Sequence, residues 1–392
     1  MNIIYFMLID LITIIYLFLI NSIEYFFYEM IFYNLNKFYF GTFICLLLAT
    51  ISFFVSNILG EQIFHSKINI FSPIIISILS GMVICNLIQI PKFITPGIEF
   101  SSNYILRVGI IFLGIKLSIL DVFEISKTVL PIIIICLITS ILLANYMTRI
   151  LGISNKMGTL IATGTSICGT SAILVTGSII NSNKEEVAYA IANITIFGIC
   201  AMIIYPFLSF YFFDNNFVAI GIFLGTAIHD TSQVAGAGII FSEQYNAPKV
   251  MQVAMITKLV RNICMILVIP IVSIMYNNKS KLSGLKENFN IFTMIPLFIF
   301  GFLVMCIIRT IGDYGLENDG FAFSIIDEHY WKEIILFFSS MSEYTLAVAM
   351  AAVGLTTNFR SLFVLGIKPF CVGLSVTLFI TTLSILLIII TF

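Results

Sequence analysis

Most of the chain consists of apolar runs about twenty residues long, separated by short polar segments. A helix of about 20 apolar residues spans the hydrocarbon core of a bilayer. Eleven runs fit this length, at residues 40–59, 70–90, 104–120, 129–147, 157–180, 187–212, 217–240, 250–275, 291–312, 333–355 and 366–391. A further run at 3–20 contains Asp10 and no basic leader, which favours an extra helix or surface segment over a cleaved signal. The pattern predicts an all-α integral membrane protein with about eleven transmembrane helices.

Two polar, glycine-rich stretches interrupt these runs. The first lies within the 157–180 run and contains glycines and hydroxyl residues: Gly164, Thr165, Ser166, Gly169, Thr170 and Ser171. Hydrocarbon does not tolerate a broken helix unless the break is buried in protein or lines a watery cavity. A helix N-terminus at such a break offers N–H groups and positive charge, which suit an anion. Close packing between helices is the alternative interpretation, because small residues also fill tight membrane interfaces.

The second polar stretch lies within the 217–240 run. His229 and Asp230 are adjacent there, and four polar residues flank them: Thr226, Thr231, Ser232 and Gln233. Ionisable residues inside membrane spans are costly, so they indicate a functional site. The sequence predicts that this pair couples to a proton or a sodium ion. A loop at the membrane surface is the alternative, since the pair would be well hydrated there.

Three charged residues in other spans are further candidates. Lys258 and Arg261 are three residues apart and share a helix face. They predict a cationic pair that attracts an anion, because the guanidinium can bind two oxygens at once; the alternative is that both side chains reach the membrane surface. Glu343 lies in the 333–355 span and is expected to pair with a buried cation.

Composition excludes several classes of protein. The chain is 60% apolar and 10% charged, whereas soluble domains carry about 25% charged residues. The net charge of −1 offers no basic surface for nucleic acid. None of the eight cysteines forms a CxxC pair, so we expect no zinc site, disulfide framework or cofactor. A faint echo between residues 114–123 and 354–363 favours two inverted repeats, which are common in transporters.

These motifs together resemble the YeiH-type sulfate exporter family. The resemblance extends over about residues 40–392 and rests on segments in the same order: 164–172, 185–192, 197–206, 225–238, 258–261, 347–355 and 366–369. The family often has Glu where Asp230 stands, and small apolar residues where Thr170 and Ser171 stand. The resemblance implies a polytopic protein of the bacterial inner membrane that exports an anion, and it transfers this class rather than a particular substrate.

The sequence thus predicts an N-terminal hydrophobic or interfacial extension, 1–39, and a polytopic membrane transport domain, 40–392. The expected function is secondary transport of a small anion, sulfate or a related sulfur oxyanion, driven by a proton or sodium gradient. No Walker A motif is present, so ATP is not the direct energy source. We do not expect the protein to be an enzyme. The main alternative to a transporter is a passive channel or pore, and a membrane-embedded enzyme or assembly factor is a weaker alternative. The sequence leaves open whether the chain forms a homo-oligomer.

Overall fold

The fold is helical in the part of the chain that a computed structural model describes, namely residues 35–58, 73–265, 267–269, 271–272, 298–357 and 367–392. Eight helical segments there are long and apolar enough to cross a membrane, and three shorter apolar helices accompany them. This result confirms the predicted all-α membrane protein. The predicted number of about eleven spans stays a prediction, because 3–20 and 273–297 lie outside the described residues.

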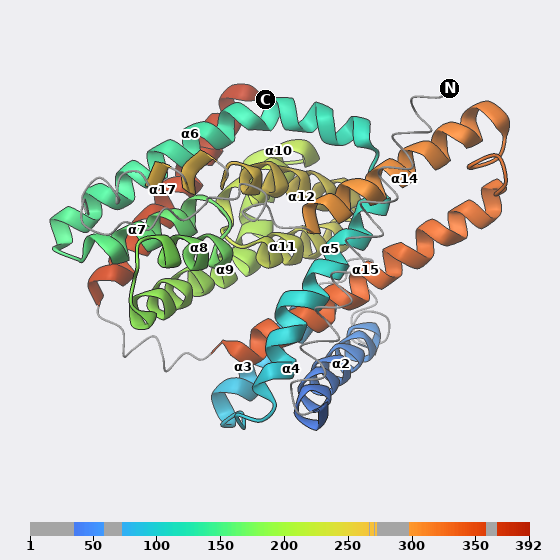
Figure 1. Cartoon of the computed structure of the whole chain (residues 1–392). Helices are drawn as coiled ribbons and strands as arrows, with labels where there is room; N and C mark the ends of the chain where they lie inside the picture. The colour runs from blue at the N-terminus through green and yellow to red at the C-terminus, as the bar shows by residue number, and fades with distance from the viewer. Residues whose placement is uncertain (1–34, 59–72, 266, 270, 273–297, 358–366) are drawn as a thin grey trace, which may run out of the picture.

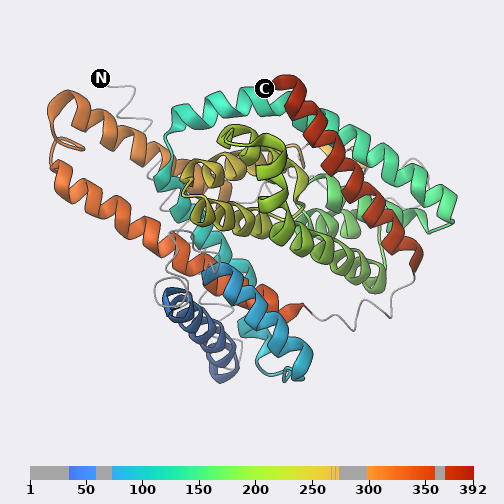
Figure 2. The same cartoon turned by 180° about the vertical axis from the view of Figure 1, so that it is seen from behind.

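The described helices form two bundles, which lie side by side in both views (Figures 1 and 2). The first, called the outer bundle, comprises α2 (Leu35–Asn57), α3 (Pro73–Leu87), α4 (Thr95–Phe100), η2 (Ser101–Ile105), α5 (Leu106–Leu113), η3 (Gly114–Lys116), α14 (Phe298–Asp319) and α15 (Glu328–Thr356). The second, called the core bundle, comprises α6 (Ile119–Leu151), α7 (Asn155–Ser166), α8 (Thr170–Ile179), α9 (Lys184–Phe213), α10 (Phe217–Ala227), α11 (Thr231–Gln244), α12 (Pro248–Ile263) and α17 (Ile367–Thr391).

Close helix packing and an ion pair between helices hold the described part of the outer bundle together. Helix α15 packs along α3 and α5. Gly81 of α3 lies so close to α15 that a Cβ atom there would be 2.5 Å from the carbonyl oxygen of Ala351, a type of contact that small residues permit in membranes. Lys116 Nζ lies 2.8 Å from Glu343 Oε1. This pair confirms the prediction that Glu343 has a cationic partner.

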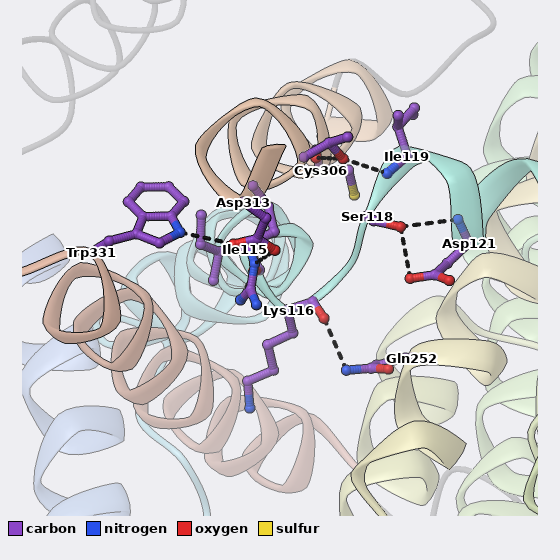
Figure 3. Close-up of polar contacts among 11 residues, drawn as sticks. Ile115, Lys116, Ser118, Ile119, Asp121, Gln252, Cys306, Asp313 and Trp331 are labelled. Atoms are coloured by element: carbon purple, nitrogen blue, oxygen red, sulfur yellow. Dashed lines mark hydrogen bonds and ion pairs between the residues drawn. The ribbon is translucent and has the colours of Figure 1, made fainter. Parts of the chain in front are cut away.

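The chain passes from the outer bundle into the core bundle at residues 116–119, and side chains of both bundles hold this junction (Figure 3). The carbonyl of Lys116 accepts a hydrogen bond from Nε2 of Gln252 on α12, at 3.0 Å. The N–H of Ile119, the first residue of α6, donates to Thr310 Oγ1 on α14, at 2.8 Å. The predicted 104–120 span therefore ends at Lys116 and begins at Thr95, because the extended backbone at Leu117 stops the helix.

Helices α6 and α2 extend beyond the spans that the sequence pattern predicts. Helix α6 is longer than the predicted 129–147 span, since Ser118 caps its first turn and Gly152, with φ of 64°, ends it. Helix α2 begins at Leu35, inside the predicted 1–39 extension, and the rest of that extension lies outside the described residues. The two bundles meet where α11 packs on α3 and α15 and where α14 lies beside α6. The core bundle contains two broken helices, α7–α8 and α10–α11.

Candidate functional site

The first predicted break separates α7 from α8 at residues 167–169. Ile167 leaves the helical conformation, with φ −114° and ψ −92°. Gly169 then adopts φ 70° and ψ −124°, a conformation that glycine adopts far more readily than other residues. No side chain caps the start of α8 from the Gly169 position. The N–H groups at this start therefore depend on partners from elsewhere in the chain.

The second predicted break separates α10 from α11 at residues 228–230. Ile228 is extended, and Asp230 is the N-cap of α11. Gln233 completes a capping box, since its Oε1 accepts from the N–H of Asp230 at 3.3 Å. Gln233 also donates from Nε2 to the carbonyl of Thr195 on α9, at 3.1 Å. The break therefore has a defined conformation, and the hydrogen bond from Gln233 to Thr195 anchors it to α9.

The two breaks meet inside the core bundle. The N–H of Thr170 at the start of α8 donates to Asp230 Oδ2 at 3.4 Å. A Cβ atom on Gly169 would lie 2.7 Å from the same Oδ2 atom, so glycine leaves room for this approach. His229 Nδ1 lies 3.1 Å from the carbonyl oxygen of Thr165 on α7. Four helix ends thus converge: the C-termini of α7 and α10 and the N-termini of α8 and α11. We call this the crossing.

Lys258 and Arg261 reach the crossing from α12, and both are buried, with 0% and 3% of their surface exposed. This burial rules out the alternative in which they extend to the membrane surface. Lys258 Nζ donates to the carbonyls of Ile167, Ile228 and His229. Two cations therefore lie among the helix C-termini, where carbonyls carry partial negative charge.

Arg261 bonds to both interrupted helices. Its Nε donates to the Ser166 carbonyl at 2.7 Å, and its Nη1 donates to the Thr226 carbonyl at 2.8 Å. Nη1 also lies 3.0 Å from the Ile228 carbonyl, and Nη2 bonds to the Thr165 carbonyl. Carbonyls freed by a break in a low-dielectric interior need such donors. The guanidinium fork supplies four contacts from one side chain, more than a lysine could.

Asp230 balances the opposite helix ends. Its Oδ1 accepts from the N–H and the hydroxyl of Ser232, at 3.0 Å and 2.8 Å. Its Oδ2 accepts from the N–H of Thr170 on α8. One carboxylate therefore lies at the N-termini of both α8 and α11, where negative charge is stabilised. Basic side chains lie at the two helix C-termini and a carboxylate lies at the two N-termini, so the side-chain charges complement the dipoles of the broken helices.

His229 is fully buried, which rules out the alternative of a surface loop. The Thr165 carbonyl can only accept, so Nδ1 carries a hydrogen. The other ring nitrogen, Nε2, lies 2.8 Å from Thr377 Oγ1 on α17, and that hydroxyl itself donates to the carbonyl of Gly373 at 2.8 Å. The ring thereby ties the second break to α7 and α17.

The structure brings most of the predicted site residues together at or near the crossing, but not all of their side chains point toward it. Thr165 Oγ1 bonds to carbonyls of its own helix, and Ser166 Oγ lies 2.7 Å from Ser140 Oγ on α6. Gly164 packs against Ile173 and Ile194. These three residues contribute backbone or packing rather than side-chain groups aimed at the crossing. Their role in substrate binding stays a prediction.

The least buried polar groups at the crossing belong to its N-terminal side. Thr170 and Asp230 are partly exposed and Ser171 is exposed, whereas Thr231, Ser232 and Gln233 are buried. Sequence reasoning missed Asn262, whose Nδ2 donates to Thr231 Oγ1 at 3.2 Å. It also missed Thr377, the partner of His229. Asn262 directly follows Arg261 in the sequence, and this adjacency was its only signal.

Comparison with known proteins places the chain in a family. Residues 43–373 match the family described as Conserved hypothetical protein 698. The chain belongs to this family. It is 31% identical over 347 residues to a UPF0324 membrane protein of Fusobacterium nucleatum. The matched residues cover 86% of this chain and 93% of the relative.

Two further relatives extend this result. A UPF0324 membrane protein of Clostridium tetani is 30% identical over 365 residues, or 90% of this chain and 97% of the relative. The UPF0324 inner membrane protein YeiH of Escherichia coli is 29% identical over 311 residues, or 78% of this chain and 81% of the relative. These matches confirm the resemblance to YeiH-type proteins and the assignment of the chain as a membrane protein. The relatives' names give a location in the membrane and no substrate.

Proposed function

We propose that this protein is a secondary transporter of a small anion in the bacterial plasma membrane. Sulfate or a related sulfur oxyanion is the first candidate substrate, and a proton or sodium gradient is the driving force. The convergence of two helix N-termini at one partly exposed point carries the proposal. The starts of α8 and α11 both lie at Asp230, beside the exposed Ser171. Such N-termini bind anions through their N–H groups and dipoles.

The charges at the crossing support an anionic substrate. Lys258 and Arg261 are two basic side chains, and within the described residues Asp230 is the one carboxylate hydrogen-bonded at the crossing. Basic side chains therefore outnumber carboxylates at the crossing. An incoming anion would balance this excess in a region of low dielectric constant, where such compensation matters most.

The arrangement of the bundles supports transport. The crossing lies within the core bundle, and the outer bundle contacts α11, the helix that starts at the crossing. Movement of one bundle against the other would change access to a site near the start of α11 without breaking the core. Transporters with discontinuous helices commonly work in this way.

Flux of radiolabelled sulfate into proteoliposomes tests the proposal, with and without imposed pH and sodium gradients. We expect saturable, gradient-dependent uptake that sulfite and thiosulfate reduce by competition. Uptake that does not saturate and needs no gradient would favour the channel. Absence of sulfate, sulfite and thiosulfate flux from folded protein would overturn anion transport of this class.

A proline substitution tests the assignment of the N–H groups. Thr170→Pro removes the first N–H of α8, a position at which helices accept proline. We expect sulfate uptake to fall by about tenfold or more, the equivalent of one hydrogen bond to a charged group. The matched control is Glu328→Pro at the first position of α15, which is exposed and lies in the outer bundle. Equal uptake by both variants would remove the start of α8 from the site.

A further inference from the structure

The carboxylate of Asp230 occupies the position that the proposed function gives to the substrate. It accepts the N–H of Thr170 on α8 and both the N–H and the hydroxyl of Ser232 on α11. Gly169 allows this approach, because any side chain there would collide with Oδ2. The donors best suited to an external anion are therefore already bonded to an internal one.

A second observation at the same place points to a ligand that carries a hydrogen. Asn262 is 2% exposed, and its Nδ2 donates to the hydroxyl of Thr231, the first residue of α11. Its Oδ1 has no hydrogen-bond partner within the described residues. A buried acceptor without a donor is unfavourable. The amide thus offers an acceptor at the start of α11 to a protonated or hydrated group.

The basic side chains near Asp230 in the described part of the chain have their donors on helix carbonyls, so they give an incoming anion no hydrogen bond. Helix α12 presents Lys258 and Arg261, and both donate to helix carbonyls. The breaks themselves add the thiol of Cys168 and the imidazole of His229, whose Nδ1 faces the Thr165 carbonyl. Helix α9 contributes the neutral Thr195 carbonyl through Gln233, and α3, which packs on α11, contains no charged residue. On α15 the charged residues are Glu328, Lys332, Glu333 and Glu343, of which Glu343 pairs with Lys116.

An anion on these N–H groups would therefore lie beside a carboxylate. Two anions that share one small site do not both stay ionised, and a single proton relieves the repulsion. The carboxylate of Asp230 is partly exposed and can take that proton.

We propose that the substrate anion and the Asp230 carboxylate compete for the same N–H donors, and that Asp230 binds one proton from solution whenever the anion takes its place. This inference rests on the proposed function and names its coupling ion as the proton, with one proton carried for each anion. The only bond formed is the O–H bond of Asp230, and the proton returns to water when the anion leaves.

The test measures sulfate and thiosulfate binding to the purified full-length protein by calorimetry across a range of pH. These two probes do not titrate near neutral pH, so any proton taken up binds to the protein. For the wild type, we expect the affinity for the anion to weaken by about tenfold per pH unit wherever one proton is taken up on binding, as linkage of one proton requires. A weakly buffered titration should show one proton taken up for each anion bound.

The Asp230→Asn variant should bind the same anions with an affinity that does not change with pH and with no proton uptake. Asparagine is as good an N-cap as aspartate, so α11 should keep its start. The control is Asp214→Asn, which alters an exposed carboxylate at the end of α9. This control should keep the pH dependence of the wild type.

The outcomes separate the inference from the proposed function. Wild-type binding that does not depend on pH would overturn the inference, and so would loss of binding in a folded Asp230→Asn variant. Either result would leave the proposed function standing, because the wild type would still bind the anion. If neither probe binds wild-type protein at any pH, the proposed function fails. If the Asn variant does not fold, proton uptake by the wild type decides: one proton per anion supports the inference and none overturns it.

Discussion

Replacement of Arg261 by alanine should strongly destabilise the fold. Arg261 lies in the interior and donates to carbonyls at the ends of both α7 and α10. Alanine removes every one of these donors and leaves a space that water cannot readily reach. The sequence alone suggested a residue that binds only substrate, and for such a residue the fold would not depend on the side chain.

The structure sets the size of the effect. The Thr165 carbonyl also faces His229, and the Ile228 carbonyl also bonds to Lys258, so each keeps a partner. Within the described residues, the carbonyls of Ser166 and Thr226 accept from Arg261 alone. Each buried acceptor left without a partner costs about 1–3 kcal/mol. We therefore expect a loss of about 2–6 kcal/mol, similar to the cost of removing one partner of a buried ion pair, about 3–5 kcal/mol.

Equilibrium unfolding in mixed micelles with increasing SDS measures this free energy, with helix content followed by circular dichroism. Arg149→Ala is the matched control, because Arg149 is exposed in the last turn of α6, and it should change stability by less than about 1 kcal/mol. Arg261→Lys should fall between the two, since one ammonium can reach some of the carbonyls but lacks the planar fork. Equal unfolding curves for Arg261→Ala and Arg149→Ala would refute the role of Arg261 as the link between the broken helices.

Two further substitutions probe the surroundings of the crossing and the outer bundle. Gly198→Ala would place a Cβ atom in collision with Gln233 Oε1, so we expect a loss of about 1–3 kcal/mol from overpacking. Sulfate uptake should also weaken, because Gln233 accepts the N–H of Asp230. Wild-type stability in the same unfolding assay would contradict this packing. Glu343→Gln removes the ion pair with Lys116. The carboxylate side chain of Glu343 is 42% exposed, so the change should cost less than about 1 kcal/mol in the same assay; a larger loss would mean that the pair is better shielded than its exposure indicates.

Several features were predictable from local sequence because they depend on local chemistry. Apolar runs of membrane length gave the helices, and clusters of glycine and hydroxyl residues gave the two breaks. The expected partner of Glu343 was also found, since a charge within a span rarely lacks a counter-ion. The inverted repeat stays a prediction, because the second echo segment, 354–363, extends beyond the described residues.

Other features depend on contacts between distant parts of the chain. Lys258 and Arg261 were expected to face a substrate, and the structure shows their donors on carbonyls of the two breaks. Those carbonyls lie between 29 and 96 residues away in the sequence. Periodicity places the two cations on one helix face but carries no information about which groups that face meets.

The sequence by itself determined that this chain is a helical membrane protein with two interrupted helices, because the cost of placing polar groups in hydrocarbon leaves a strong mark on composition. Only the tertiary structure decided that the interruptions cross, and that Asp230 serves the N-termini of both α8 and α11. A carboxylate next to one helix start predicts a local cap, and its second partner depends on how the core bundle folds. The balance of charges at the crossing is therefore a property of packing, since it joins helix ends that no local pattern relates.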